Sequence, residues 1–326
     1  MKTLAIAIAF ALTAAAVASE GQDKKPLTPQ ERVDFNPSQD ELFSESGVTR
    51  GVKASEAECR KVEGAVWAAV GSDAECIRYW HAGFTDGKAP KALFYFDGDL
   101  LVGNPANFEV PTHYLRASPK SRQAATSAVA ARLGVPYVFV GRPGVFGSSG
   151  DHRQRRRPLE AQLMSAAIDA IKERHGIQKI SVAGFSGGGL VVASLLTMRS
   201  DVECAVPASA NSAPKMRWTM RGLTQDLTGY SDSFEPGEHL SAALAATGVR
   251  VFVLGDPGDM NVPWSTQLVI AKRLKQLGVA VEELEGEGTG PARHDLAGSS
   301  TLIGSMCMKG ATTQEILERV KHGLKG

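Results

Sequence analysis

Short apolar runs alternate with longer amphipathic stretches along most of this chain. The short runs are bounded by glycine, proline and polar residues and predict buried β-strands at 64–70, 75–80, 92–96, 136–140, 180–184, 203–207, 249–254 and 279–284. The amphipathic stretches have helical periodicity and predict α-helices at 121–133, 159–175, 188–198, 264–277 and 313–324. Because strands and helices alternate, we expect an α/β fold with a doubly wound, mainly parallel, eight-stranded sheet.

The stretch 211–240 lies between two predicted strands and is much longer than an ordinary connection. It contains aromatic and methionine side chains, among them Trp218 and Tyr230. We expect a lid-like insertion in which these side chains pack the lid, with a recognition groove as the alternative.

The first residues have the pattern of an export signal. Lys2 supplies a positive start, Leu4 to Val17 is almost continuously apolar, and Ala16-Val17-Ala18 resembles a signal-peptidase site. The apolar run is short for a membrane span, so a retained anchor is the minor alternative. We expect a periplasmic or secreted protein without a stable membrane anchor. The chain then divides into a signal peptide, an irregular arm and one domain, at 1–18, 19–48 and 49–326.

Export would place the four cysteines in an oxidising compartment, where an even number predicts disulfides. Cys59 and Cys76 flank the first predicted strand, so we expect a bridge across neighbouring strands. Cys204 and Cys307 would form a second disulfide or remain free buried thiols.

Composition narrows the classes of function. The chain has 326 residues, 43% of them hydrophobic, and a formal net charge of +1. That length allows a large core, and the charge gives no electrostatic case for binding nucleic acid. The residue spacings fit neither a metal site nor a nucleotide-binding motif. We therefore expect no cofactor and no metal.

A glycine-flanked serine stands between the predicted strand 180–184 and the predicted helix 188–198. Gly184-Phe-Ser-Gly-Gly188 fits the G-x-S-x-G pattern, in which a sharp turn exposes a serine oxygen above a parallel sheet. The free N–H groups at the start of the helix would face developing negative charge. We interpret Ser186 as a nucleophile, with a structural glycine-rich turn as the alternative.

Two later loops supply the other groups that a serine nucleophile needs. A histidine must take the serine proton, and a buried carboxylate must orient that histidine. An apolar strand is followed by Asp256 and Asp259, and a later glycine-rich loop contains His294. The order of serine, acid and histidine is the one found in α/β-hydrolases.

Negative charge that develops on a substrate oxygen requires fixed N–H donors. One expected donor is the backbone N–H of Gly187, directly after the nucleophile. The other comes from the loop after the strand 92–96, where we favour the backbone N–H of Asp99.

From about Gly64 to Leu324 the chain resembles the α/β-hydrolase superfamily. Gly184–Gly189 and Asp259-Met-Asn-Val-Pro263 match the family's nucleophile and acid motifs, which favours Asp259 over Asp256, and 141–150 looks like the glycine-rich loop after the fourth strand. The serine motif looks closest to those of esterases and prolyl-oligopeptidase-like peptidases. The chain is too short to contain the propeller domain of the latter.

Asp97-Gly98 stands where the resemblance leads us to expect His-Gly. A carboxylate there would oppose a developing oxyanion unless it turns away or pairs with an arginine. The run Arg153-Gln-Arg-Arg-Arg157 follows His152 and is typical of a solvated face. The alternatives are a site for an acidic substrate group, or partners for Asp97 or Asp99. We assign His152 no catalytic role and expect the histidines outside the site on the surface or at helix caps.

Together these features predict an exported serine hydrolase that cleaves a small or medium-sized carboxylic ester. The triad would be Ser186, Asp259 and His294, and the reaction would pass through an acyl-enzyme. A peptidase or amidase uses the same triad, so peptide substrates are an alternative. A third possibility is a non-catalytic binding protein that kept the fold, which the carboxylate of Asp97 favours.

Overall fold

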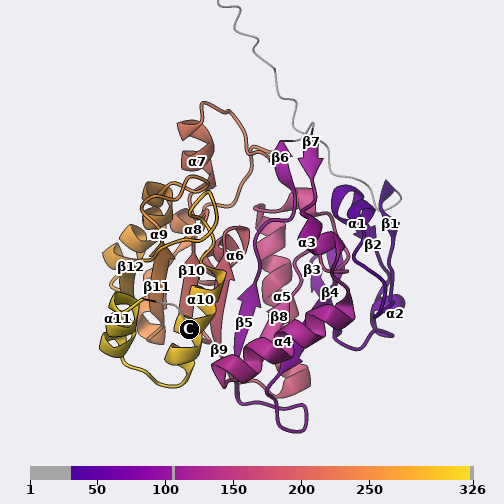
Figure 1. Ribbon diagram of the computed structural model, residues 1–326, viewed down its shortest axis with the longest axis horizontal. Helices are drawn as coiled ribbons and strands as arrows, with labels where there is room; N and C mark the ends of the chain where they lie inside the picture. Colours follow the sequence, from indigo (N-terminus) through magenta and orange to yellow (C-terminus); the bar gives the residue numbers. More distant parts are fainter. Residues whose placement is uncertain (1–30, 105–106, 324–326) are drawn as a thin grey trace, which may run out of the picture.

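An eight-stranded sheet forms the centre of the molecule (Figure 1). The structure, a computed structural model, describes residues 31–104 and 107–323. The strands are β3 Ala65–Val70, β4 Asp73–Ala82, β5 Lys91–Phe96, β8 Tyr137–Val140, β9 Lys179–Phe185, β10 Val202–Ala208, β11 Arg250–Gly255 and β12 Ala280–Glu285. Their order is β12-β11-β10-β9-β5-β8-β4-β3, and β4 is antiparallel to both neighbours while the other pairs are parallel. The expected doubly wound, mainly parallel, eight-stranded sheet is confirmed.

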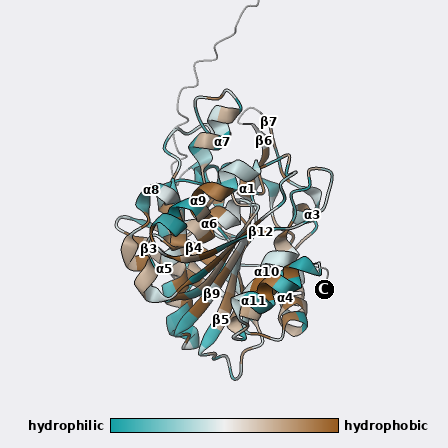
Figure 2. Ribbon diagram, turned by 90° about the vertical axis from the view of Figure 1, so that its left-hand side faces the viewer, coloured by the Kyte–Doolittle hydropathy of each residue, from teal (hydrophilic) through white to brown (hydrophobic). Residues whose placement is uncertain are grey.

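Helices cover both faces of the sheet, and apolar stretches of the strands lie between them (Figure 2). The helices are α4 Pro119–Leu133, α5 Pro158–His175, α6 Gly187–Leu195, α9 Trp264–Gln276, α10 Ala297–Met308 and α11 Thr313–Lys321. Buried residues of α5, α6 and α9 form one core with the sheet, and those of α4, α10 and α11 belong to the core on the other face. Both α4 and α5 begin with a proline and end at a left-handed glycine, Gly134 and Gly176, as helix-capping preferences predict.

The apolar pattern does not predict α10, the helix that follows the His294 loop. Its sequence is rich in glycine and serine, which have low helix propensity. A Cβ added to Gly304 would come 2.8 Å from Leu93 Cδ1, so the absence of a side chain lets α10 lie close against β5. Packing on the sheet therefore stabilises a helix that propensity alone would not.

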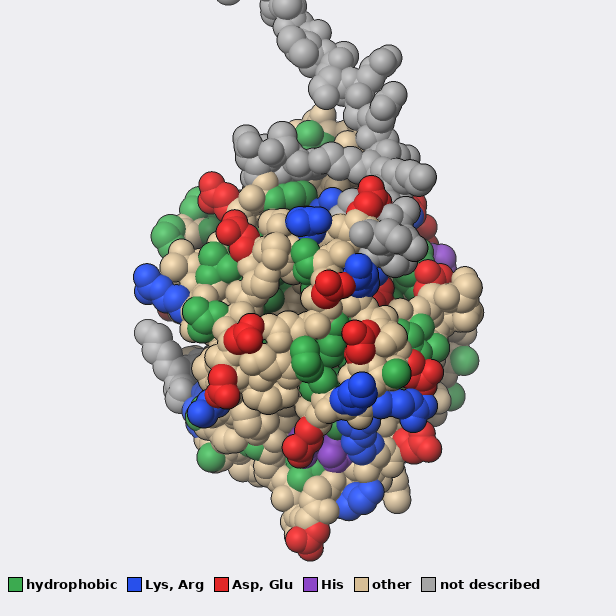
Figure 3. Space-filling model, turned by 90° about the vertical axis from the view of Figure 1, so that its right-hand side faces the viewer, with side chains coloured by type: hydrophobic (Ala, Val, Ile, Leu, Met, Phe, Trp, Pro, Cys, Tyr) green, Lys and Arg blue, Asp and Glu red, His purple; other side chains and the backbone are tan. Residues whose placement is uncertain are grey.

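The N-terminal part of the described chain packs against the sheet domain. Its short elements are β1 Val33–Asp34, α1 Glu45–Arg50, β2 Val52–Lys53 and α2 Glu56–Cys59. Phe43 is buried and stacks on Tyr114 of α3 Thr112–Leu115 with 5.2 Å between the ring centroids. On the side of the molecule that is at the right in Figure 1, acidic and basic side chains are interspersed (Figure 3). The predicted signal peptide, 1–18, and the first part of the predicted arm, 19–30, lie outside the described residues. None of the described helices is both long and apolar enough to cross a membrane.

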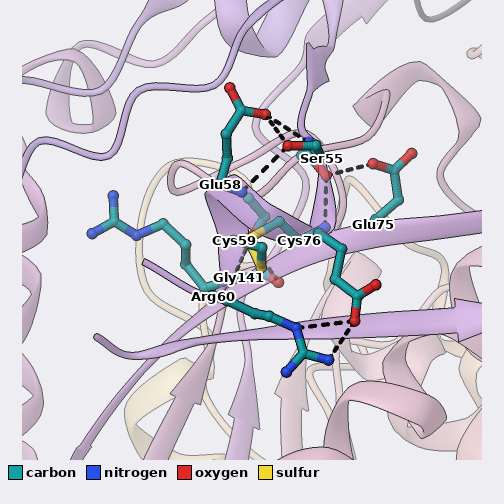
Figure 4. The surroundings of a disulfide bond; sticks show 11 residues. Ser55, Glu58, Cys59, Arg60, Glu75, Cys76 and Gly141 are labelled. Atoms are coloured by element: carbon teal, nitrogen blue, oxygen red, sulfur yellow. Dashed lines mark hydrogen bonds and ion pairs between the residues drawn. A yellow bond between two sulfur atoms is a disulfide. The ribbon is translucent and has the colours of Figure 1, made fainter. Parts of the chain in front are cut away.

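Two disulfides connect the four cysteines. Cys59–Cys76 joins the end of α2 to β4 (Figure 4), and Cys204–Cys307 joins β10 to α10. The expected bridge between neighbouring strands is wrong in one respect, because Cys59 lies on a helix. A capping box between Ser55 and Glu58 starts that helix, which the sequence pattern did not predict.

The segment 211–240, which we call the lid-like segment, lies at the end of the molecule where the parallel strands terminate (Figure 1). It contains α7 Pro214–Met220 and α8 Pro236–His239. The hairpin of β6 Val102–Asn104 and β7 Asn107–Glu109 lies at the same end. Trp218 and Tyr230 are buried, whereas Met216 and Met220 are exposed, so the aromatic side chains pack the segment.

Two histidines expected on the surface or at helix caps belong to a cluster of aromatic rings with Tyr79 and Phe84. The rings of His81 and His175 are 4.4 Å apart, and His175 is buried. Tyr79 Oη lies 2.8 Å from His175 Nε2, and the Gly87 carbonyl lies 2.7 Å from Nδ1. Burial lowers the pKa of both imidazoles. The expectation of a surface or helix-capping role is therefore corrected for His175, because its ring is buried and its two nitrogens contact Tyr79 and Gly87 and not the end of its own helix.

We expect His175→Gln to lose less stability on acidification than the wild type. In the unfolded chain the imidazole of His175 has the ordinary pKa of 6.5, whereas burial lowers this pKa in the folded chain. The unfolded state therefore binds this proton more readily than the folded state does. The stability contributed by neutral His175 is thus complete above that pH and decreases below it. Urea unfolding at about pH 7.5 and about pH 5.5 measures the difference. His113→Gln, at an exposed position, should retain the wild-type difference, and an unchanged loss in His175→Gln would contradict the prediction.

Candidate active site

Ser186 occupies a strained turn between β9 and α6. Its backbone has φ 54 and ψ −116, a combination that L-residues rarely adopt. The Ser186 N–H donates to the Ala208 carbonyl at 2.9 Å, which ties the turn to the end of β10. A Cβ on Gly188 would collide with the Phe96 carbonyl, so glycine is required for α6 to approach the end of β5. The turn leaves the Ser186 side chain half-buried at the carboxyl edge of the sheet.

His294 contacts the serine from the loop between β12 and α10. His294 Nε2 lies 2.9 Å from Ser186 Oγ, and His294 Nδ1 lies 2.7 Å from Asp259 Oδ2. With a proton on Nδ1 donated to the carboxylate, Nε2 can accept the hydrogen bond from the serine hydroxyl. The Phe185 ring packs 4.9 Å from the imidazole, and Ser209 Oγ donates to the His294 carbonyl at 2.6 Å. The predicted nucleophile, base and acid thus lie in one hydrogen-bonded series.

Asp259 is buried and receives hydrogen bonds on both carboxylate oxygens. Oδ1 accepts from the backbone N–H groups of Asn261 at 2.8 Å and Val262 at 2.9 Å. Oδ2 accepts from Gln267 Nε2 at 3.2 Å in addition to His294. Gln267 lies on α9 and is itself fully buried, and nothing in the sequence pattern marked it. These donors fix the carboxylate in the orientation that the imidazole requires.

Asp256, the competing acid, has a different partner. It is fully buried and accepts from Arg293 Nε at 2.9 Å and Arg293 Nη2 at 2.8 Å. Backbone N–H groups of Gly258 and Gly288 also donate to it, at 2.7 Å and 2.9 Å. Burial alone would raise the pKa of Asp256, but these bonds lower it. Asp256 therefore ties the histidine loop to the acid loop and does not contact the imidazole.

The predicted oxyanion donors belong to the first residue of α6 and to the loop after β5. Gly187 is the first residue of α6, where a helix leaves the N–H without an internal partner. The Asp99 N–H donates no hydrogen bond to any described residue. Asp97 Oδ1 accepts from the Gly98 N–H at 2.9 Å and from Tyr95 Oη at 3.3 Å. Asp97 is thus held by Tyr95 and its own loop, and none of the described basic residues forms an ion pair with it.

Two arginines of the run, Arg155 and Arg156, are buried, contrary to the solvated face that the composition favoured, while Arg153 and Arg157 are partly exposed. Arg155 and Arg156 are almost fully buried and pair with Asp99, while Arg153 pairs with Asp151. Burial alone would raise the pKa of Asp99, but Arg156 and Arg142 hold it well below its usual value. Burial lowers the pKa of Arg155 to about 10, with neighbouring Arg156 as the next cause. The run therefore supplies partners for Asp99, one of the alternatives considered from the sequence.

His152 is also fully buried, in the same region. Its Nε2 accepts from the Leu100 N–H at 3.3 Å, and its Nδ1 lies 3.3 Å from the Pro143 carbonyl. Burial, with Arg142 as the next cause, lowers the pKa of His152 well below its usual value. The neutral ring supports the loop after β5. In the part of the chain that the structure describes, no three potential metal ligands come together.

No protein-family model matches the chain, and no curated protein matches it. Similar solved structures include an acylaminoacyl peptidase from Pyrococcus horikoshii, with 14% identity and a TM-score of 0.50 over 78% of this chain and 41% of that chain. Prolyl oligopeptidase B from Galerina marginata has 12% identity and a TM-score of 0.51 over 76% of this chain and 37% of that chain. Est1E from Butyrivibrio proteoclasticus, with ferulic acid bound, has 16% identity and a TM-score of 0.48 over 76% of this chain and 99% of that chain. The chain spans less than half the length of the two peptidases, and the likeness concerns the fold.

The variants Asp259→Asn and Asp256→Asn distinguish the roles of the two buried carboxylates. If Asp259 orients the imidazole, Asp259→Asn lowers kcat for an activated ester by about 10³–10⁴-fold, because the amide favours the wrong tautomer. Asp256→Asn weakens the Arg293 bridge and lowers kcat by about tenfold at most, since only loop positioning suffers. Steady-state kinetics with p-nitrophenyl acetate on both folded variants measures this. Equal losses would contradict the assignment of separate roles.

Proposed function

The chain has the α/β-hydrolase fold, and we propose that it is an exported serine hydrolase that cleaves a carboxylic ester through an acyl-enzyme. The observation that carries the proposal is the hydrogen-bonded series of Ser186, His294 and Asp259, with distances of 2.9 Å and 2.7 Å. The strained serine at the start of α6 supports it, because a positive φ at a non-glycine residue is costly and recurs at functional sites.

In the first half of the reaction, Ser186 Oγ attacks the ester carbonyl carbon while its proton passes to His294 Nε2. Asp259 stabilises the imidazolium that forms. The tetrahedral intermediate then collapses as the C–O bond to the alcohol breaks. His294 returns the proton to the leaving alkoxide, so the alcohol departs neutral and Ser186 retains the acyl group.

In the second half, a water molecule replaces the alcohol. His294 accepts a proton from this water as its oxygen attacks the acyl carbon. Collapse of the second tetrahedral intermediate breaks the bond to Ser186 Oγ, which recovers its proton from His294. The products are a carboxylic acid and the free enzyme, and no cofactor takes part.

The developing oxyanion would accept hydrogen bonds from the backbone N–H groups of Gly187 and Asp99. Both N–H groups are without a described partner, and the positive end of the α6 dipole adds to the favourable field. Asp97 directly precedes Gly98, which lies close to the Ser186 side chain. The Asp97 carboxylate would therefore oppose the negative charge of the oxyanion. The bonds from Tyr95 and Gly98 disperse part of the carboxylate's charge.

The triad variants test the proposal directly. Ser186→Ala and His294→Ala should each remove nearly all turnover of p-nitrophenyl acetate, with losses on the order of 10⁵–10⁶-fold in kcat. The double variant should be little worse than either single variant, because the two groups act as one unit. Losses that multiply in the double variant would contradict the triad.

A fluorophosphonate probe distinguishes the hydrolase from a non-catalytic binding protein of the same fold. We expect labelling of Ser186 in the wild type and none in Ser186→Ala. If folded wild-type protein stays unlabelled while a control hydrolase reacts, the result contradicts the hydrolase and supports the non-catalytic binding protein. Acyl esters of graded length beside aminoacyl amides then separate an esterase from a peptidase.

The proposed export is tested through the cysteines. Two disulfides support an oxidising compartment, since such bonds are rare in reducing ones. Protein isolated with thiols blocked at lysis should carry no blocking groups on its four cysteines under non-reducing mass analysis. Four blocked cysteines would contradict both the disulfides and the export.

A further inference from the structure

Four charged residues beneath the serine turn form a closed ring of hydrogen bonds. Arg142 Nη1 donates to Asp99 Oδ1 at 2.9 Å, and Arg142 Nε donates to Glu160 Oε1 at 2.8 Å. Glu160 Oε2 accepts from the Arg156 backbone N–H at 2.7 Å. Arg156 Nη1 closes the ring by donating to Asp99 Oδ2. Each of the four residues is therefore held by two others.

This ring contacts both segments that carry the proposed oxyanion donors. A Cβ on Gly187 would collide with Asp99 Oδ1 and would lie 2.7 Å from Arg142 Nη1, so the ion pair packs directly on the start of α6. Arg142 Nη1 also donates to the Asp97 carbonyl at 3.2 Å. The loop Asp97-Gly98-Asp99, called here the oxyanion loop, is thus fixed at both ends by one guanidinium.

Arg156 extends the ring to the lid-like segment. Its Nε donates to Asp226 Oδ2 at 3.0 Å, and its Nη2 donates to Asp226 Oδ1 at 2.5 Å. Its backbone carbonyl accepts from the Phe234 N–H at 2.7 Å. One guanidinium thus joins a carboxylate of the oxyanion loop to a carboxylate of the lid-like segment, and the two cannot shift independently without breaking a buried ion pair.

The Arg156 backbone has φ +68, the left-handed region that a non-glycine residue rarely occupies. Its side chain and that of Asp226 are almost entirely buried. The surrounding bonds therefore hold this residue in a conformation that it would not adopt alone.

The arginines of this network have carboxylate partners within the protein, and the buried guanidinium of nearby Arg217 donates instead to Asn261. Three guanidinium groups, of Arg142, Arg155 and Arg156, face three carboxylates, of Asp99, Glu160 and Asp226. This arrangement satisfies the arginines internally and favours a positioning role over a site for an acidic substrate group.

We propose that Arg156 is a positioning residue that couples the seating of the lid-like segment to the geometry of the oxyanion loop, and thereby to turnover at Ser186. The kinetic part rests on the proposed hydrolase function, whereas the structural coupling does not. Asp226 contributes through Arg156 and does not contact the serine, the histidine or the acid in the described bonds.

Asp226→Asn tests this coupling with a nearly isosteric change. We expect kcat for p-nitrophenyl acetate to fall about tenfold while KM stays within about twofold, because the altered group acts on transition-state geometry and not on binding of the small acyl group. Asp232→Asn is the matched control in the same segment. It removes the exposed Arg157–Asp232 pair, which makes no contact with Asp99, and should leave kcat unchanged.

Hydrogen exchange supplies a readout that does not depend on catalysis. The Leu100 N–H donates to buried His152 and reports on the end of the oxyanion loop. Its exchange should accelerate in Asp226→Asn and not in Asp232→Asn. If Asp226→Asn has the same exchange rate at Leu100 and the same kcat as the wild type, the proposal is wrong. If the wild-type protein shows no turnover but exchange at Leu100 is still faster in Asp226→Asn, the structural coupling is supported and the proposed hydrolase function is wrong.

Arg156→Lys is the second variant if Asp226→Asn does not fold. Lysine keeps the charge but cannot bridge two carboxylates with a planar fork. It should show the same drop in kcat at nearly constant KM and the same faster exchange at Leu100. A folded Arg156→Lys protein with wild-type values of both would equally overturn the proposal.

Discussion

The tight turn at Ser186 is the constraint on which the rest of the site depends. A serine with φ 54 is strained, and its surroundings must hold it there. They do so because β9 lies between β5 and β10, so that the ends of both neighbours flank the turn. The end of β10 accepts the Ser186 N–H, and the end of β5 leaves no room for a side chain at Gly188. The strand order thereby brings the oxyanion loop to the serine and leaves the opposite side open to the histidine loop.

Charge burial is the second constraint, and it links regions far apart in the sequence. Taking a guanidinium out of water is unfavourable unless carboxylates satisfy it, and removing one partner leaves the other charge uncompensated. The ring of Arg142, Asp99, Arg156 and Glu160 meets this condition with groups from the ends of β5 and β8, the start of α5 and the segment between them. Asp226 adds the lid-like segment. An ion-pair network whose members depend on one another therefore holds the loops around the serine, in addition to the apolar packing of residues such as Leu100 and Phe146.

The central parallel strands β5, β8, β9 and β11 were predictable because each is a nearly continuous apolar run, as buried parallel strands require. The Ser186, Asp259 and His294 positions could be proposed because each follows a strand end in a characteristic order. Other features gave no such signal. The glycine- and serine-rich helix α10 forms through close packing on β5, which propensity cannot report. The arginine run has the composition of a solvated face, and the burial of Arg155 and Arg156 depends on carboxylates at positions 99 and 226 that only the fold brings near.

The contrast between the buried aspartates explains why Asp259 suits the imidazole. Asp99, Asp226 and Asp256 each face an arginine, whose positive charge already compensates theirs. In the described part of the chain, the ion-pair partner of Asp259 is His294, and its other hydrogen bonds come from two backbone N–H groups and the amide of Gln267. Neutral donors orient a carboxylate without cancelling its charge. Asp259 can therefore stabilise a proton that arrives on His294, which a carboxylate already paired with arginine would do far less well. The fold thus uses arginine-paired carboxylates to hold loops and keeps the carboxylate without an arginine for the histidine.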